Sequence, residues 1–142
     1  MRNPEILYPA VALAFWTLFV LFLMPLARFR AAFRGEVAAD DFKLGESARV
    51  PAHVRIPNRN YMNLLELPVL FYVVCVLLFV TAGASHLAAM LAWAFVALRV
   101  LHSAIHLTYN KVEHRLTVFA ASVLVLLALW VIAALHLATA GW

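Results

Sequence analysis

Charged residues are scarce in this sequence, and cysteine is nearly absent. Of the 142 residues, 13% are charged, 66% are hydrophobic and one is cysteine. A soluble domain carries roughly 25% charged residues and about 45–50% apolar ones. A chain this short cannot hide the apolar excess in one core, because much of its surface stays exposed. The composition therefore excludes an ordinary water-soluble domain, and the lone Cys75 excludes an internal disulfide or a cysteine-rich metal site.

Long segments without any charge define the predicted membrane spans. Residues 6–27, 67–98 and 116–142 contain no Asp, Glu, Lys or Arg. The first and last suit single spans of about 20 residues, and the middle one is long enough for two spans that turn in the small-residue segment 81–85. The sequence predicts one all-α membrane domain over residues 1–142, an antiparallel bundle of four transmembrane helices. The predicted spans are about 5–27, 59–81, 85–109 and 115–139.

Basic residues gather at two of the connections between these spans. A predicted loop at about residues 28–58 and its edges hold seven Arg and Lys residues, and the third connection holds Lys111 and Arg115. The opposite side offers Arg2. Because basic residues favour the cytoplasmic side of a membrane, we expect both charged connections there and both termini outside. The positive charge indicates contact with the headgroups of membrane lipids, and no nucleic-acid partner is expected.

Polar residues recur every three or four positions on the second and third predicted helices, so each set shares one helical face. They are Arg59, Asn63 and Glu66 on the second helix and Arg99, His102, Ser103 and His106 on the third. An antiparallel hairpin that turns near residue 82 or 83 predicts Arg59 level with His106, Asn63 with His102, and Glu66 with Arg99. Polar groups from both helices then meet at the same depth.

The depth of Glu66 and Arg99 predicts an ion pair between them. An unpaired charge near the bilayer centre costs at least about 2.5–3.5 kcal/mol, so such residues pair and face the interior of the bundle. We expect Glu66 and Arg99 to form this structural ion pair, with Asn63, His102 and Ser103 completing a hydrogen-bonded network around it.

Two other interpretations of the polar stripe stay open. Polar side chains often only hold membrane helices together. Alternatively, the i, i+4 spacing of His102 and His106 suits shared ligation of a metal or haem. The segment between them lacks the Glu that a zinc protease motif places after its first His, and no further ligands cluster nearby. No metal site is therefore predicted.

The same residues resemble the motifs of a known family. Residues 59–68, Arg-Asn-Tyr-Met-Asn-Leu-Leu-Glu-Leu-Pro, are similar to the second-helix motif of the MAPEG family, the membrane-associated proteins in eicosanoid and glutathione metabolism. Residues 99–103, with Arg115 sixteen positions after Arg99, are similar to the third-helix pattern of its prostaglandin E synthase and bacterial members. The resemblance covers the whole chain, and its nearest pattern is that of bacterial proteins like the microsomal glutathione transferases.

The resemblance implies a homotrimer that binds glutathione as co-substrate between subunits, in a bacterial inner membrane with periplasmic termini. It implies a glutathione S-transferase or peroxidase that activates the thiolate toward a lipophilic electrophile or hydroperoxide. Arg115 would stabilise the thiolate, and His106 would assist it. The residues expected to contact glutathione are Arg28, Arg30, Arg59, Asn63, Glu66, His102, Ser103 and Tyr109.

One position departs from the family pattern. His106 stands where many members carry a tyrosine that binds or activates the thiol, and a neutral imidazole can donate a hydrogen bond or act as a base there. Tyr109, three residues further on, is the candidate substitute. The departure keeps a second function open: a non-catalytic accessory subunit of a larger membrane complex, or a lipid-binding scaffold.

Overall fold

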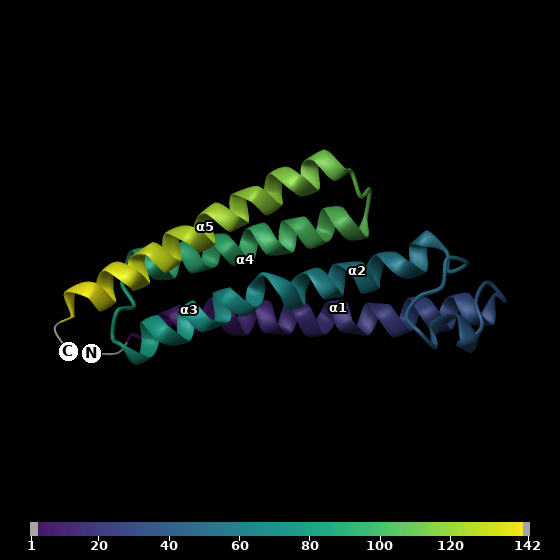
Figure 1. Ribbon diagram of the computed structural model, residues 1–142, viewed down its shortest axis with the longest axis horizontal. Coiled ribbons are helices and arrows are strands. Elements are labelled where there is room, and N and C mark those ends of the chain that lie inside the picture. Colours follow the sequence, from purple (N-terminus) through teal and green to yellow (C-terminus); the bar gives the residue numbers. More distant parts are fainter. Residues whose placement is uncertain (1–2, 141–142) are drawn as a thin grey trace.

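The computed structural model describes residues 3–140, which fold into helices with no β-strand (Figure 1). The elements are η1 (Pro4–Ile6), α1 (Leu7–Phe33), η2 (Ala39–Phe42), α2 (Ala52–Glu66), α3 (Pro68–Val80), α4 (His86–Leu107) and α5 (Val112–Thr139). Four helical segments are long and apolar enough to cross a membrane: Pro4–Phe33, Ala52–Val80, His86–Leu107 and Val112–Thr139. The predicted all-α architecture of four membrane helices is confirmed, and the chain is an integral membrane protein.

The first two spans are longer than predicted, and the loop between them is shorter. α1 continues to Phe33 and α2 begins at Ala52, whereas the sequence placed a loop over residues 28–58. Pro57 lies inside α2, and Pro51 precedes the helix in an extended conformation. Pro57 is the sixth residue of α2, so the helix continues past it with one hydrogen bond fewer, the bond to the carbonyl group of His53.

The second span is interrupted once, where α2 meets α3. Pro68 has no N–H group to donate, and its ring displaces the carbonyl group of Leu64 four residues before it. Leu67 keeps helical dihedral angles between the two helices, so the span continues through the interruption. This local opening of the backbone lies directly beside the polar residues of α2.

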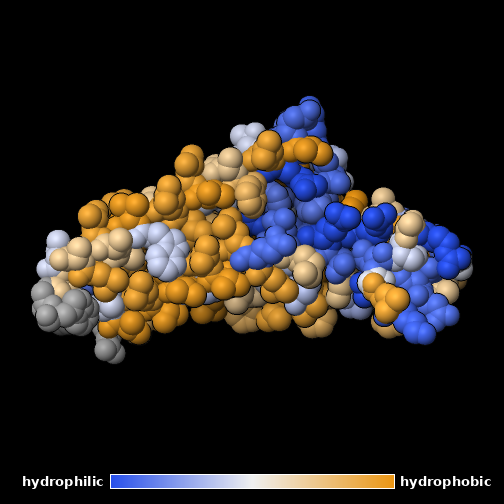
Figure 2. Space-filling view, viewed as in Figure 1, coloured by the Kyte–Doolittle hydropathy of each residue, from blue (hydrophilic) through white to orange (hydrophobic). Residues whose placement is uncertain are grey.

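The apolar core lies between the four spans. Leu13 of α1, Phe71 of α3, Phe95 of α4 and Leu129 of α5 are fully buried, and the rings of Phe71 and Phe95 stack with centroids 4.5 Å apart. Hydrophobic side chains also cover the outer surface of the half that carries the termini, whereas the end with the α1–α2 and α4–α5 connections is hydrophilic (Figure 2). This division suits a protein whose apolar half is surrounded by lipid.

The turn between α3 and α4 is closed by a helix-ending motif of backbone hydrogen bonds. Ala82 N donates to the carbonyl oxygen of Phe79 (3.2 Å), and Gly83 N donates to that of Leu78 (2.9 Å). Ala82 adopts a left-handed conformation with φ of 58°. These are the two bonds of a Schellman motif, which satisfies the last carbonyl groups of a helix.

His136 of α5 is hydrogen-bonded to this turn. Its ring donates from Nε2 to the carbonyl oxygen of Thr81 (3.0 Å), and a Cβ atom on Gly83 would meet the same ring. The absence of a side chain at Gly83 therefore allows the end of α5 to pack against the α3–α4 turn.

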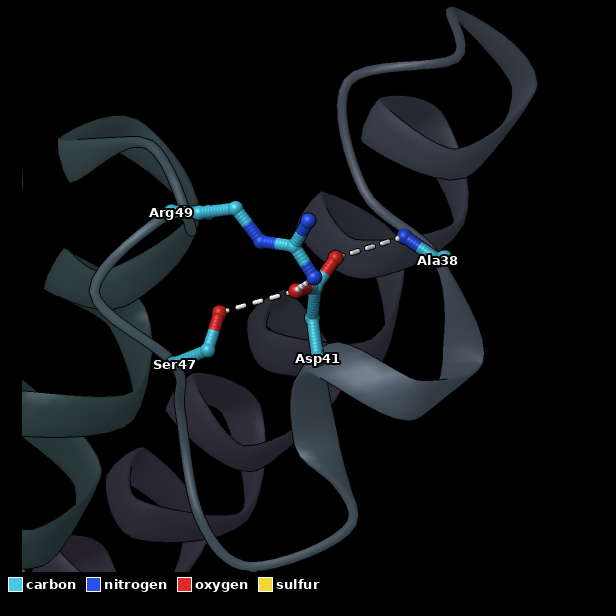
Figure 3. A network of polar contacts seen from close by, with 4 residues as sticks. All are labelled: Ala38, Asp41, Ser47 and Arg49. Atoms are coloured by element: carbon cyan, nitrogen blue, oxygen red, sulfur yellow. Dashed lines mark hydrogen bonds and ion pairs between the residues drawn. The ribbon is translucent and has the colours of Figure 1, made fainter.

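The loop between α1 and α2 is folded around the carboxylate of Asp41 (Figure 3). Asp41 accepts hydrogen bonds from Ala38 N (2.9 Å) and Ser47 Oγ (2.8 Å), and Arg49 Nη2 lies 3.2 Å from its Oδ1. The hydrogen bond from Ala38 lowers the pKa of Asp41 below its usual 3.8, and Ser47 and Arg49 act in the same direction, while burial opposes them. The ionised form of Asp41 therefore stabilises the loop.

We expect Gly83→Ala to destabilise the protein by about 1–3 kcal/mol, because the added methyl group overlaps the His136 ring. The thermal unfolding midpoint in detergent would fall accordingly. The double variant Gly83→Ala, His136→Ala removes the overlap and should lose less than the sum of the two single variants. Additive losses would show that the two residues do not interact.

The Asp41 network predicts a pH-dependent loop. Because the folded pKa lies below the unfolded one, the stabilisation is complete above pH 3.8 and is lost as the pH falls through the lowered pKa. The NMR shift of the Ala38 amide should titrate with a midpoint below 3.8. At neutral pH, Asp41→Asn should speed tryptic cleavage after Lys43 and Arg49, whereas the exposed neighbour control Asp40→Asn should not. Equal cleavage rates in both variants would contradict this role.

Candidate functional site

A pocket of about 440 Å³ lies where α2 faces the connection between α4 and α5. α2 supplies one wall, and the end of α4, the following turn and the start of α5 supply the other. The lining residues are Ile56, Arg59, Met62, Asn63, Glu66, His106, Asn110 and Arg115. Five of the residues that the sequence proposed for the site thus meet at one cavity: Arg59, Asn63, Glu66, His106 and Arg115.

The α2 wall follows from helical spacing. Arg59, Asn63 and Glu66 are four and three positions apart, so they share one face. Arg59 and Glu66 are exposed in the single chain, and Asn63 is partly buried between them. The pocket therefore presents a cation, an amide and an anion in a row along α2.

Arg115 is held in the opposite wall by Asn110. Its Nη1 donates to Asn110 Oδ1 at 2.6 Å, and the Asn110 backbone has a left-handed φ of 51°. Asn tolerates this conformation better than other side chains do. Asn110 was not among the predicted site residues, although an Asn directly after a predicted helix is the signal that could have found it.

His106 and His102 lie on the buried face of α4. Each is 3% exposed, and their rings meet edge to face with centroids 6.0 Å apart. Their Nδ1 atoms are buried without a hydrogen-bond partner among the residues that the structure describes. His106 lines the pocket, so its ring is available to a bound molecule. Among residues 3–140, no three His, Cys, Asp or Glu side chains group closely enough to hold a metal ion.

A second pocket of about 230 Å³ shares Asn63 and Arg115 with the first. His102, Val112, Leu116 and Phe119 complete its lining, so the residues that it does not share with the first pocket are mostly apolar. Leu116 is 64% exposed on α5, inside a membrane span. Arg115 and Asn63 thus stand between a polar pocket and an apolar one.

The predicted ion pair between Glu66 and Arg99 is not formed in this chain. The Arg99 side chain is fully buried, and its Nη2 donates to Asn63 Oδ1 (2.8 Å) and to the Asn63 carbonyl oxygen (3.2 Å). Glu66 instead lines the pocket. A carbonyl oxygen has two lone pairs, so that of Asn63 can accept a hydrogen bond from the Arg99 side chain.

The register between α2 and α4 explains this difference. Ser103 Oγ donates to Asn60 Oδ1 at 2.9 Å, and Arg99 pairs with Asn63, whereas the sequence predicted Asn63 level with His102. Against the predicted pairing, the bond between Ser103 and Asn60 is offset by two residues and that between Arg99 and Asn63 by three, or about 3–4.5 Å at 1.5 Å per residue, which is less than one helical turn. The predicted pairing counted the same number of residues from the turn along each helix, which holds only for straight helices. The interruption at Pro68 and the geometry of the Schellman turn change the register. Asn60, fully buried, is a further network residue that the prediction missed.

Four predicted glutathione contacts line neither of these two pockets. Arg28 pairs with Glu46 (3.3 Å), and Arg30 is exposed at the end of α1. Ser103 is buried against Asn60, and the Tyr109 hydroxyl is hydrogen-bonded to His114 Nδ1 (3.0 Å). Arg28 and Arg30 lie on α1, Ser103 lies in the interface between α2 and α4, and Tyr109 lies in the α4–α5 turn. His102, also predicted, lies at the smaller pocket.

Comparison with known proteins places the chain in a family. The model of the MAPEG family matches residues 6–135, so the chain belongs to the MAPEG family and the resemblance of its motifs is confirmed. No curated protein and no solved structure shows a significant match. The family contains glutathione transferases and peroxidases as well as non-catalytic members, and glutathione is its general ligand.

Proposed function

We propose that this MAPEG-family protein is a glutathione-dependent membrane enzyme that binds glutathione in the 440 Å³ pocket and activates its thiol. The second substrate would be a lipophilic electrophile or hydroperoxide that arrives from the membrane. The observation that carries this proposal is the convergence of two arginines, a glutamate and an unpartnered histidine on one cavity.

The charges of the pocket complement those of glutathione, which carries two carboxylates and one ammonium group at neutral pH. Arg59 can bind a carboxylate with two hydrogen bonds, and Glu66 can accept hydrogen bonds from the ammonium group. The amide of Asn63 can donate to a carboxylate or accept from the ammonium group. Arg59 and Glu66 are exposed in the single chain. The proposal therefore includes a homotrimer in which a neighbouring subunit covers this side of the pocket.

Arg115 is the proposed thiolate stabiliser. A guanidinium group beside a thiol lowers the thiol pKa and so raises the fraction of reactive thiolate at neutral pH. The hydrogen bond from Nη1 to Asn110 orients the group, while its buried Nε has no hydrogen-bond partner within residues 3–140. His106 lines the same pocket and can take the thiol proton.

The smaller pocket supports a lipophilic co-substrate. It begins at Arg115 and extends along Leu116 and Phe119, on a helix that spans the membrane. A thiolate held at Arg115 would stand at the boundary of the two pockets, with the peptide on the polar side and the lipophilic partner on the apolar side. This arrangement accounts for a glutathione-using enzyme inside a bilayer.

The first test is Arg115→Ala, with Arg34→Ala as control, since Arg34 is 69% exposed and outside the pocket. Loss of the guanidinium should lower kcat/KM for a lipophilic electrophile roughly 100-fold, as removal of a group that stabilises developing negative charge does. Thiolate absorbance of bound glutathione should titrate at higher pH than in the parent protein. If the parent binds no glutathione at millimolar concentration, the accessory-subunit or scaffold function replaces this one.

Asn110 should act as a positioning residue. Asn110→Gly keeps the left-handed backbone accessible but removes the acceptor for Arg115, so we expect kcat to fall roughly tenfold or more, with a small change in the KM for glutathione. The pH profile of kcat should shift toward higher pH. Asn110→Asp retains an acceptor oxygen and should restore most of the rate. An unchanged kcat in Asn110→Gly, which retains the turn, would mean that Asn110 serves only the turn.

A further inference from the structure

The loop between α1 and α2 carries a nearly fully exposed leucine near its middle. Leu44 is 99% exposed, and its neighbours Lys43 and Gly45 are exposed as well. Gly45 has a φ of 95°, and Lys43 and Gly45 form an isolated backbone bridge across Leu44. The segment Lys43–Gly45, which we name the loop tip, is therefore a tight turn that projects one large apolar side chain.

The loop behind this tip is firmly folded. Besides the Asp41 network, a small apolar cluster joins it to both helices: Val37 and Phe42 pack against Ala31, Val50 and Val54. The exposure of Leu44 is consequently a property of a defined conformation and not of a loosely held segment.

The loop folds back along α1 toward the membrane. Phe42, just before the tip, lies under the Arg28 guanidinium at 4.5 Å, and Glu46, just after it, pairs with Arg28 at 3.3 Å. The tip is therefore tied on both sides to Arg28, although α1 continues to Phe33.

Arg28 marks the edge of the hydrocarbon layer. The uncharged stretch of the first span ends at Ala27. Counted from Leu7, about 20 residues at 1.5 Å each cover the roughly 30 Å of a hydrocarbon core, which also ends near Ala27. The uncharged stretch and the span length agree on the level of Arg28, and the loop tip lies near this level because Phe42 and Glu46 on either side of it contact Arg28.

We propose that the loop tip is a membrane-inserted anchor, in which Leu44 enters the acyl-chain boundary of the adjacent leaflet and Lys43 extends to lipid phosphate groups. An apolar side chain at this level gains by leaving water, and a lysine keeps its ammonium in the headgroup layer. The Asp41 network and the Arg28–Glu46 pair hold the loop in the conformation that presents the tip. The partner of this surface is the phospholipid bilayer itself.

The test uses the full-length protein in phosphatidylcholine nanodiscs, with a nitroxide attached at Leu44→Cys. Cys75 is fully buried, and unmodified protein reports any background labelling. Collisions with oxygen, which concentrates in lipid, are compared with collisions with a water-soluble nickel chelate. Phe22→Cys, 71% exposed in the first span, is the lipid reference. Arg34→Cys is the aqueous reference, because it lies about 9 Å beyond Arg28 along α1.

An oxygen-to-nickel ratio at Leu44 near that of Phe22 supports insertion, and a ratio equal to that of Arg34 overturns it. A label shielded from both reagents would mean that protein, such as a second copy of the chain, covers the tip, which also overturns the proposal. In the same nanodiscs, Leu44→Asp should speed amide exchange over residues 39–46 several-fold, whereas Leu44→Ile should not. None of these readouts depends on glutathione.

Discussion

The burial of Arg99 is the constraint on which the site depends. A fully buried guanidinium within a membrane span needs an acceptor, and Asn63 supplies both its amide oxygen and its backbone carbonyl oxygen. The backbone oxygen can accept this bond because a carbonyl group has two lone pairs. This contact, together with the bond between Ser103 and Asn60, fixes α2 against α4 and holds the polar face of α2 toward the start of α5.

Glu66 remains free for a ligand because Arg99 bonds to Asn63. Had Glu66 paired with Arg99, the carboxylate would have been used inside the bundle; instead it lines the pocket with Arg59. Arg115 faces them from α5, oriented by Asn110. A buried network therefore positions the site, while the groups proposed to bind glutathione stay accessible. The division matches the general need for rigid support around a functional side chain.

Pairs of charged residues also hold the α1–α2 loop in place. Arg28, a candidate for the glutathione site by sequence, is engaged by Glu46 and Phe42 and so ties the loop to the level where the apolar part of α1 ends. Asp41 organises the remainder of the loop through three contacts. These contacts give the loop a defined conformation. Along the long axis of the molecule, the loop extends past the α4–α5 connection (Figure 1).

The sequence by itself determined the four membrane helices and the polar stripes, because lipid demands uncharged runs of a set length and helical spacing decides which residues share a face. It also determined the family, through the motif from Arg59 to Pro68 and the residues from Arg99 to Arg115. Only the tertiary structure decided that Arg99 bonds to Asn63, that Asn110 orients Arg115, and that Arg28 turns to the loop. These contacts depend on the register between helices, which the interruption at Pro68 and the turn near Gly83 set, and residue counting cannot supply it.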